Sequence, residues 1–482
     1  MQFDNNTTRI RRSILVRLAK LCFEGRTQEG IDRIPIEMRP KAAHHDRCCV
    51  HKERAVIRYR LMAMLGYGVE EETDELTPLS EYAARALERD HAGRTGLTVI
   101  DEACSACIHA NYFITNACRG CYARPCKLNC PKKCISFVDG KAAIDPQKCV
   151  NCGKCMKVCP YHAIVYIPIP CEEECPVGAI SKDESGREII DDSKCILCAK
   201  CMSACPFGAI MDKSQVMDVI KWLLSDRPVV AMIAPSIVGQ FEASLEQVNG
   251  ALKKLGFDHV MEVASGADVT AQNEAAELEE RMANGDSFMT TSCCPAFVET
   301  VEKHVPILKP FVSHTGTPMH YTAELASNQH PEAIRVFIGP CPAKRREAAR
   351  DELVDYALTF EELGSMLVAK GINVEEAEPV STESPASASG RGFPISGGVA
   401  GAVMDMASDE NDSEVRPEFV NGISEPTIRA LKNYASSPGE FNLLEVMCCE
   451  GGCISGPCVI EGARKAAKRV QDLKLESSKP SK

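Results

Sequence analysis

The sequence predicts an α/β protein built from a small helical N-terminal domain, a cysteine-rich central module and a larger α/β domain with mostly parallel sheets. Three observations predict this architecture. The chain has 482 residues, which is more than one ordinary core accommodates. Apolar residues recur with helical spacing over the first hundred residues, whereas short apolar runs alternate with helical stretches after residue 212. A segment rich in Cys, Pro and Lys separates these two parts. We therefore expect domains at 1–99, 100–214 and 215–464, and a frayed tail at 465–482.

The N-terminal domain is predicted from three helical stretches, 12–25, 53–66 and 79–93, each of which ends on Gly. It also contains a group of possible metal ligands, His44, His45, Cys48, Cys49 and His51. Adjacent cysteines chelate poorly and no second Cys-x2-Cys accompanies them, so we expect a structural role for this group and for Cys22.

Composition excludes several classes of protein. The chain carries 67 acidic and 55 basic residues, a net charge of -12, and shows no basic patch for nucleic acid. No run approaches the ~20 apolar residues of a membrane helix, and the N-terminus lacks the apolar core of a signal peptide. We therefore expect a cytoplasmic protein that binds neither nucleic acid nor membranes. In that reducing compartment, 27 cysteines indicate metal ligation rather than disulfides.

The C-terminal half alternates between predicted strands and helices. Apolar runs at 228–236, 287–294, 335–341 and 442–449 are typical of buried strands, and the helical stretches are 214–225, 275–283 and 295–304. The polar, breaker-rich segment 375–392 is predicted to be a surface loop.

Three runs of cysteines carry the spacing of iron–sulfur clusters. They are Cys118, Cys121, Cys126 and Cys130; Cys149, Cys152, Cys155 and Cys159; and Cys195, Cys198, Cys201 and Cys205, each followed by Pro. These runs resemble bacterial ferredoxins, in which three thiolates of a run hold one [4Fe–4S] cube and the fourth holds the neighbouring cube. The first two runs then pair, giving one cluster on Cys118, Cys121, Cys126 and Cys159 and another on Cys149, Cys152, Cys155 and Cys130.

The third run has no complete partner. Cys171-x3-Cys175-Pro repeats the closing half of a run, so Cys175 would complete a cluster with Cys195, Cys198 and Cys201. A fourth accessory cluster on Cys104, Cys107, Cys171 and Cys205 is arithmetically possible, and the sequence leaves it open. Zinc on four thiolates is the alternative, which the repeated Cys-Pro endings disfavour. Cys134 is interpreted as a spare buried thiol.

The later cysteines each follow a predicted strand. Because ligands of open parallel sheets bind beyond the carboxyl ends of the strands, thiolates from three strands should reach one crevice. These residues are Cys293, Cys294, Cys341, Cys449 and Cys453. A further metal centre is therefore expected there.

Three segments in this half resemble the signature segments of the [FeFe] hydrogenases, and their versions are most similar to the group B branch. They are TSCCPAF at 291–297, GPCPAKRRE at 339–347 and EVMCCEGGCISGPC at 445–458. The resemblance runs from about residue 100 to 460 and includes APS at 234–236 and SGGVAGAV at 396–403. It implies a two-lobed α/β domain holding an H-cluster, a [4Fe–4S] cube joined to a diiron subsite with CO, cyanide and azadithiolate.

The resemblance also implies roles for single residues. Cys294, Cys341, Cys449 and Cys453 would hold the cube, with Cys453 bridging to the diiron subsite. Cys293 would pass protons to a relay of Glu274, Ser313 and Glu277, although the two glutamates could also be ordinary helix surface charge. Lys344 matches a lysine that donates to one cyanide, Pro235 and Ser236 match contacts to the other, and Met447 matches a packing methionine or plain core.

The chain departs from the family pattern at positions around the expected ligands. Gly339 replaces the usual Met, Met319 stands where Gln is common, and the tail after Cys453 is shortened to Gly-Pro-Cys. Cys448 and Cys458 are extra thiols, for which we expect no role beyond packing.

The resemblance implies an enzyme that interconverts hydrogen with protons and electrons. Three to four accessory [4Fe–4S] clusters would connect it to ferredoxin or a similar carrier, and maturation proteins would install the H-cluster. A hydrogen sensor is one alternative, against which we count the lack of a signalling domain in the sequence. A non-catalytic iron–sulfur assembly factor is the other, and such relatives lack the doubled cysteine of TSCC.

Overall fold

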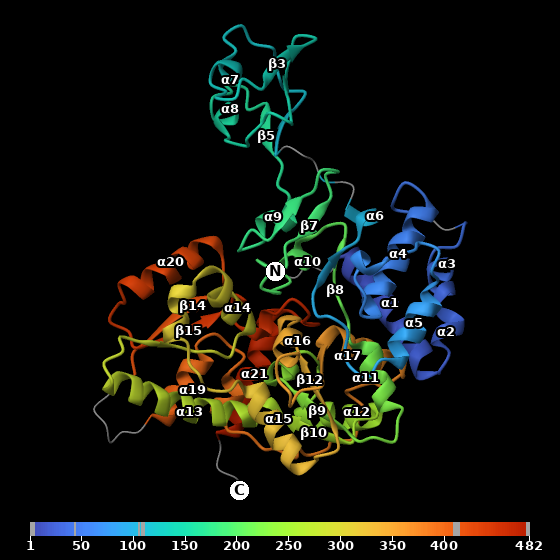
Figure 1. The fold of residues 1–482 in the computed structure, drawn as a ribbon, viewed down its shortest axis with the longest axis vertical. Helices are drawn as coiled ribbons and strands as arrows, with labels where there is room; N and C mark the ends of the chain where they lie inside the picture. Colours follow the sequence, from blue (N-terminus) through green and yellow to red (C-terminus); the bar gives the residue numbers. More distant parts are fainter. Residues whose placement is uncertain (1–4, 43–44, 105–106, 108–110, 408–414, 479–482) are drawn as a thin grey trace.

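The computed structural model describes residues 5–42, 45–104, 107, 111–407 and 415–478. These residues form a helical N-terminal part, a cysteine-rich module and an α/β body (Figure 1). Within the N-terminal group of histidines and cysteines for which we expect a structural role, His44 lies outside the described residues. No helix within the described ranges is long and apolar enough to span a bilayer.

The N-terminal part consists of short helices around a long first one. They are α1 (Asn6–Phe23), α2 (Thr27–Gly30), η1 (Ile31–Arg33), α3 (Ile34–Met38), α4 (Val50–Met64), η2 (Val69–Glu71) and α5 (Leu79–Glu88). The three predicted helices are present as α1, α4 and α5. Asn5 begins α1 by accepting a hydrogen bond from the Thr8 N–H (2.9 Å). Arg11 and Arg12 of α1 pair with the buried Glu361 (2.6 and 3.0 Å), which attaches this part to the α/β body.

The cysteine-rich module contains two halves of similar construction. The first half, which projects from the rest in Figure 1, contains β2 (Tyr112–Ile114), α7 (Pro125–Leu128), β3 (Ile135–Val138), β4 (Lys141–Ile144), α8 (Lys154–Lys157) and β5 (Ile164–Tyr166). The second contains α6 (Asp101–Cys104), α9 (Pro170–Glu173), β6 (Ile180–Lys182), β7 (Glu188–Ile190), α10 (Lys200–Ala204) and β8 (Ile210–Asp212). Strands β2–β5, β3–β4 and β6–β7 pair antiparallel, and β8 pairs with β1 (Leu97–Val99).

The α/β body has two parallel sheets, which confirms the predicted two lobes. The first has the order β10 (His259–Glu262), β9 (Val229–Ile233), β12 (Ile334–Gly339) and β13 (Tyr356–Thr359). The second has the order β11 (Met289–Thr290), β15 (Leu443–Met447) and β14 (Pro417–Asn421). All residues of β9 and β15 are buried, as expected for strands covered on both faces.

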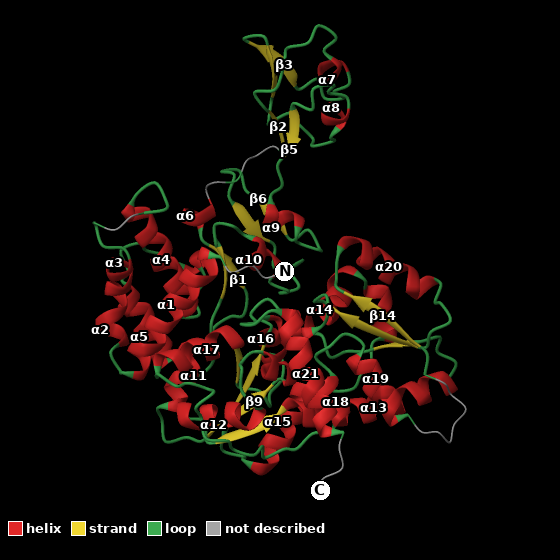
Figure 2. Cartoon of the chain, turned by 180° about the vertical axis from the view of Figure 1, so that it is seen from behind, coloured by secondary structure: helices red, strands yellow, loops and turns green. Residues whose placement is uncertain are grey.

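Helices surround both sheets (Figure 2). They are α11 (Val216–Leu223), η3 (Pro235–Gly239), α12 (Leu245–Leu255), α13 (Val263–Ala283), α14 (Pro295–His304), η4 (Pro306–Phe311), α15 (Pro318–Gln329), α16 (Ala343–Ala348), α17 (Phe360–Ala369), α18 (Ala388–Gly392), α19 (Gly398–Met406), α20 (Glu425–Ser436), η5 (Cys453–Ser455) and α21 (Ala463–Ser477). Helix α13 contacts α15 of the first lobe and α19 of the second. A Cβ at Gly266 of α13 would lie 2.2 Å from the Pro318 carbonyl oxygen, so this crossing requires glycine.

Two sequence expectations need correction. The frayed tail predicted from residue 465 is wrong for most of its length, because α21 continues to Ser477 and buries Ala466 and Val470 against η3 and η5. These two apolar residues lie one helical turn apart, and tertiary packing stabilises the turn between them. The predicted loop 375–392 ends in helix α18 over its last five residues.

Candidate metal centre

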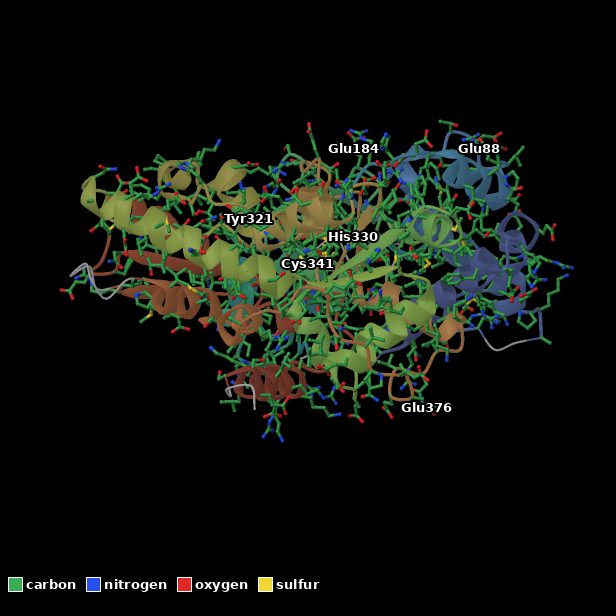
Figure 3. The ribbon with its side chains drawn as sticks, turned by 90° about the horizontal axis from the view of Figure 1, so that it is seen from below. Glu88, Glu184, Tyr321, His330, Cys341 and Glu376 are labelled. Atoms are coloured by element: carbon green, nitrogen blue, oxygen red, sulfur yellow. The ribbon has the colours of Figure 1, made fainter. Side chains whose placement is uncertain are left out.

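The strand-end thiols converge on one buried cavity. Cys293 and Cys294 follow β11, Cys341 follows β12, and Cys449 and Cys453 follow β15. All five line a cavity with an empty volume of about 890 Å³. In the view of Figure 3 Cys341 lies near the centre of the molecule, whereas Glu88, Glu184 and Glu376 lie at its edges. Pro235, Ser236, Lys344 and Met447, which were predicted from the family pattern, line the same cavity.

Most thiols of this cavity, though not Cys198 and Cys449, resist ionisation when no metal balances them. Burial and the neighbouring Cys294 and Cys449 raise the pKa of Cys453 to about 12. Burial and the same two neighbours raise the pKa of Cys341 well above its usual value. Mutually repelling, buried thiolates are stable when they share a positively charged metal centre.

The polar groups of the cavity also fit a cluster with anionic ligands. Among its described lining residues, Lys344 is the only charged side chain, and its Nζ donates to Glu347 Oε1 (2.9 Å). The Ser236 hydroxyl is buried without a hydrogen-bond partner in the described structure. A buried hydroxyl normally has a partner, so this one is available to a group bound in the cavity.

Glu274, on α13, connects this cavity to a chain of polar groups. It is fully buried, and burial raises the pKa of its carboxyl to about 8. Its Oε1 accepts from the Ser292 N–H (3.3 Å), and its Oε2 is buried without a partner. After burial, the negative charge of the ionised Glu274 carboxylate is the next cause that raises the pKa of Cys293. Glu274 is therefore core rather than helix surface charge.

Glu277 and Ser313 extend the chain of polar groups outward. Ser313 Oγ donates to Glu277 Oε2 (2.7 Å), and its hydroxyl also lowers the pKa of Glu274. Glu277 accepts further bonds from Thr315 Oγ1 (2.9 Å) and Arg281 Nε (2.9 Å), and its side chain is 16% exposed. The four predicted relay residues thus lie in the order Cys293, Glu274, Ser313 and Glu277, from the cavity to the surface.

The first two cysteine runs form two small pockets with the predicted memberships. One of about 360 Å³ is lined by Cys118, Cys121, Cys126 and Cys159, and the other, of about 340 Å³, is lined by Cys130, Cys149, Cys152 and Cys155. Each therefore collects three thiols of one run and one of the other. Cys134 is also at the second pocket, with its Sγ 3.4 Å from that of Cys130.

The remaining thiols of the module form two further groups. Burial, followed by Cys198, Cys195, Cys175 and Cys171, raises the pKa of Cys201 well above its usual value. Burial, followed by Glu188, Cys205, Cys107 and Cys104, raises the pKa of Cys171 to about 12. The structure thus brings Cys104, Cys107, Cys171 and Cys205 together, the arrangement that the sequence left open.

The backbone conformation of the second and third cysteine runs also suits iron–sulfur clusters. Asn151 and Gly153 flank Cys152 with φ of 50° and 71°, and Leu197 and Ala199 flank Cys198 with φ of 54° each. Leu and Ala rarely adopt this left-handed conformation. Alternating conformations of this kind turn successive N–H groups toward an anion and are found at iron–sulfur sites.

Comparison with known proteins agrees with this geometry. Residues 227–457 match the model described as "Iron only hydrogenase large subunit, C-terminal domain", and residues 141–164 and 188–211 each match a 4Fe-4S binding domain. The chain is an [FeFe]-hydrogenase-like protein. Its cofactors are iron–sulfur clusters.

Individual relatives of this hydrogenase-like protein include enzymes and assembly factors. It is 29% identical to iron hydrogenase 1 of Clostridium pasteurianum over 393 residues, covering 69% of this chain and 68% of the relative. It is 25% identical to a probable cytosolic Fe-S cluster assembly factor of Drosophila virilis over 323 residues, covering 54% and 67%. A solved structure from a study of [FeFe]-hydrogenase oxygen inactivation matches with a TM-score of 0.47 and 21% identity, covering 55% and 92%.

The structure shows how this hydrogenase-like protein accommodates Gly339. A Cβ at residue 339 would lie 2.5 Å from the ring of Phe337, so that ring occupies the space of a larger side chain. Phe337 lines the cavity, and Lys344 Nζ lies 5.7 Å from its ring centroid. Sequence reasoning identified the missing Met but not the aromatic ring that replaces it.

Sequence reasoning also missed the position of Cys448. This buried thiol lies between Cys198 of the cysteine-rich module and Cys449 of the cavity, and its hydrogen bonds lower the pKa of both. The pKa of Cys198 falls to about 7, and Cys198 itself lines the cavity. Cys448 therefore connects two groups of thiols, whereas Cys458 is buried near Arg11 and Arg345. The adjacency of Cys448 to a predicted ligand was the available signal.

Proposed function

We propose that the protein is an iron-only hydrogenase that interconverts hydrogen with protons and electrons at an H-cluster in the buried cavity. The observation that supports this most is that candidate ligands, a proton route and an electron route meet at the cavity. The cavity has four candidate thiol ligands, a polar chain leading to the surface, and Cys198 from the cysteine-rich module in its wall. Proton and electron access are both needed for hydrogen chemistry.

Cys294, Cys341, Cys449 and Cys453 would hold the H-cluster, whose diiron part, when bound, supplies the site where hydrogen is formed or split. Lys344 and Ser236 would orient its anionic ligands, because a buried ammonium and an unpartnered hydroxyl favour such groups. Met447 and Phe393 pack beside Cys293 and exclude water from that wall.

Protons would move along side chains of this chain. Cys293 exchanges a proton with Glu274, which the raised pKa keeps protonated near neutral pH. Ser313 connects Glu274 to Glu277, whose partly exposed carboxylate exchanges protons with solvent.

Electron transfer would be supplied by four accessory [4Fe–4S] clusters in the cysteine-rich module. The four thiol groups described above are their proposed ligand sets. The first half of the module projects from the body (Figure 1), and its side chains Tyr122, Leu128 and Val150 are exposed. A ferredoxin-like carrier would dock on this half. Maturation proteins would be needed to install the diiron part.

The test is an infrared spectrum of protein matured anaerobically with the diiron subsite, together with an assay of hydrogen evolution from a reduced dye. Stretches of metal-bound CO and cyanide together with turnover support the proposal. A cluster-loaded protein without these bands would instead favour an iron–sulfur assembly role, as named for the Drosophila relative. Bands with very slow turnover would favour a hydrogen sensor.

A further inference from the structure

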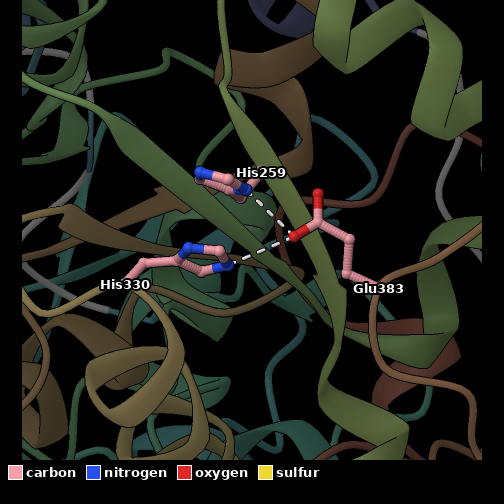
Figure 4. A group of neighbouring side chains, drawn as sticks. All are labelled: His259, His330 and Glu383. Carbon is pink, nitrogen blue, oxygen red and sulfur yellow. Dashed lines mark hydrogen bonds and ion pairs between the residues drawn. The ribbon is translucent and has the colours of Figure 1, made fainter.

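A second group of possible metal ligands lies away from all the cysteines. His259 is the first residue of β10, His330 directly follows α15, and Glu383 belongs to the loop before α18 (Figure 4). The thiol cavity lies beyond the carboxyl end of β10, where Val263 and Ala267 of α13 line it. His259 is at the amino end of that strand. The two sites therefore lie at opposite ends of the same sheet.

The donor atoms of the three side chains already converge. Glu383 Oε2 lies 2.9 Å from His259 Nδ1 and 3.2 Å from His330 Nε2, and all three atoms lie within 4.8 Å of one another. A tetrahedral zinc ion with bonds near 2.0–2.1 Å separates its donors by about 3.3 Å. Two of the three separations are thus close to the spacing that one ion requires.

The arrangement and the chemistry of the two rings also favour an ion. The rings stack with centroids 3.5 Å apart and an interplanar angle of 21°. Neutral imidazole is the form that binds metals, and two imidazoles with one carboxylate are a known ligand set for zinc.

The surroundings hold Glu383 in position. Lys253 Nζ donates to Glu383 Oε1 (3.0 Å), which leaves Oε2 to face the two rings. Hydrogen bonds of this kind orient carboxylate ligands in metal sites, although the positive charge of Lys253 also lowers the affinity for an ion. The Glu383 N–H donates to the Val260 carbonyl (3.3 Å), so the loop lies along β10 before any ion binds.

We propose that His259, His330 and Glu383 bind one divalent transition-metal ion of the zinc type, separate from the iron–sulfur clusters. The ion would connect three segments that are distant in sequence: the start of β10, the end of α15 and the loop before α18. The Glu383 side chain is 30% exposed, so the ion can enter from solvent and water can take the fourth position. This inference does not depend on the proposed hydrogenase activity.

The experiment uses full-length, cluster-loaded protein titrated with one equivalent of zinc under anaerobic conditions. Zinc and iron are counted after desalting, and crystals soaked in zinc are examined by anomalous scattering at the zinc edge. We expect one zinc per chain with unchanged iron, and an anomalous peak between the three side chains. The double variant H259Q/H330Q should lose that equivalent and bind zinc at least 100-fold more weakly.

A matched control is H91Q, which removes an exposed histidine elsewhere and should bind zinc like the wild type. Glu383→Gln is a second test if the double variant does not fold, and it should weaken binding while both rings remain. The proposal is overturned if these ligand variants keep the same zinc content as the wild type. It is equally overturned if the anomalous peak lies at thiols, or if zinc is taken up only as iron is lost.

Discussion

Replacing Glu274 by glutamine tests the proton route at its most buried point. Glutamine has the size of glutamate and can accept the Ser292 N–H, but it cannot release a proton. A positioned acid or base commonly contributes ~10²–10⁴-fold to a rate. We therefore expect Glu274→Gln to lower hydrogen evolution by about 100-fold or more.

The same variant should show a pH-dependent gain in stability. The pKa of Glu274 is raised from 4.5 to about 8, so above pH 4.5 the unfolded chain ionises while the folded protein keeps the proton. The folded state then binds more protons, and stability falls as pH rises from 4.5 to 8. The loss is about 1.4 kcal/mol per pH unit, with a ceiling of about 5 kcal/mol for the whole shift. Glutamine removes this loss.

The assay measures dye-driven hydrogen evolution, with the infrared spectrum as a check of cofactor loading. In denaturant unfolding, the stability of Glu274→Gln relative to that of the wild type should increase by about 2–3 kcal/mol between pH 6 and pH 8. Glu280→Gln, at an exposed position of the same helix, should change neither property. Near-normal turnover of a fully loaded Glu274→Gln protein would refute the relay. A stability difference independent of pH would refute the raised pKa.

Three further predictions concern single cysteines. Cys293→Ala should assemble the H-cluster yet lose most of its hydrogen turnover, and Cys293→Asp should recover part of that turnover. If Cys293→Ala instead loses the cofactor, Cys293 is a ligand. Cys453→Ser should show no CO or cyanide bands while the accessory clusters survive, because a hard oxygen replaces a bridging thiolate poorly, and normal bands would remove it from the bridging role. Cys448→Ala should lower the midpoint potential of the cluster held by Cys198 by roughly 40 mV, since it removes a hydrogen bond worth about 1 kcal/mol to a cluster sulfur. An unchanged potential in an electron paramagnetic resonance titration would show that this thiol does not tune the cluster.

The sequence by itself determined the features that depend on local geometry. A Cys-x2-Cys loop brings its thiols together through a few backbone angles, so local spacing predicted three thiols of each small pocket. The resemblance to bacterial ferredoxins supplied the fourth thiol, which comes from the other run. The buried strands were equally predictable, because an unbroken apolar run such as Val229–Ile233 is buried on both faces in a parallel sheet. The family pattern then identified part of the lining of the thiol cavity, namely Cys293, Cys294, Cys341, Cys449, Cys453, Pro235, Ser236, Lys344 and Met447.

The tertiary structure decided everything that depends on contacts between distant segments. It brought Cys104 and Cys107 to Cys171 and Cys205, and it placed Cys448 beside Cys198. It also turned the expected tail after residue 465 into a packed helix.

Local spacing also did not predict how deeply single charged residues are buried, or the histidine site. Glu274 and Glu277 lie one turn apart on the same helix, and only the packing around that helix makes the first fully buried and leaves the second partly exposed. His259, His330 and Glu383 carry no spacing signal, because three separate elements supply them. Local spacing is encoded in neighbouring residues, whereas burial and long-range proximity arise only when the whole chain packs.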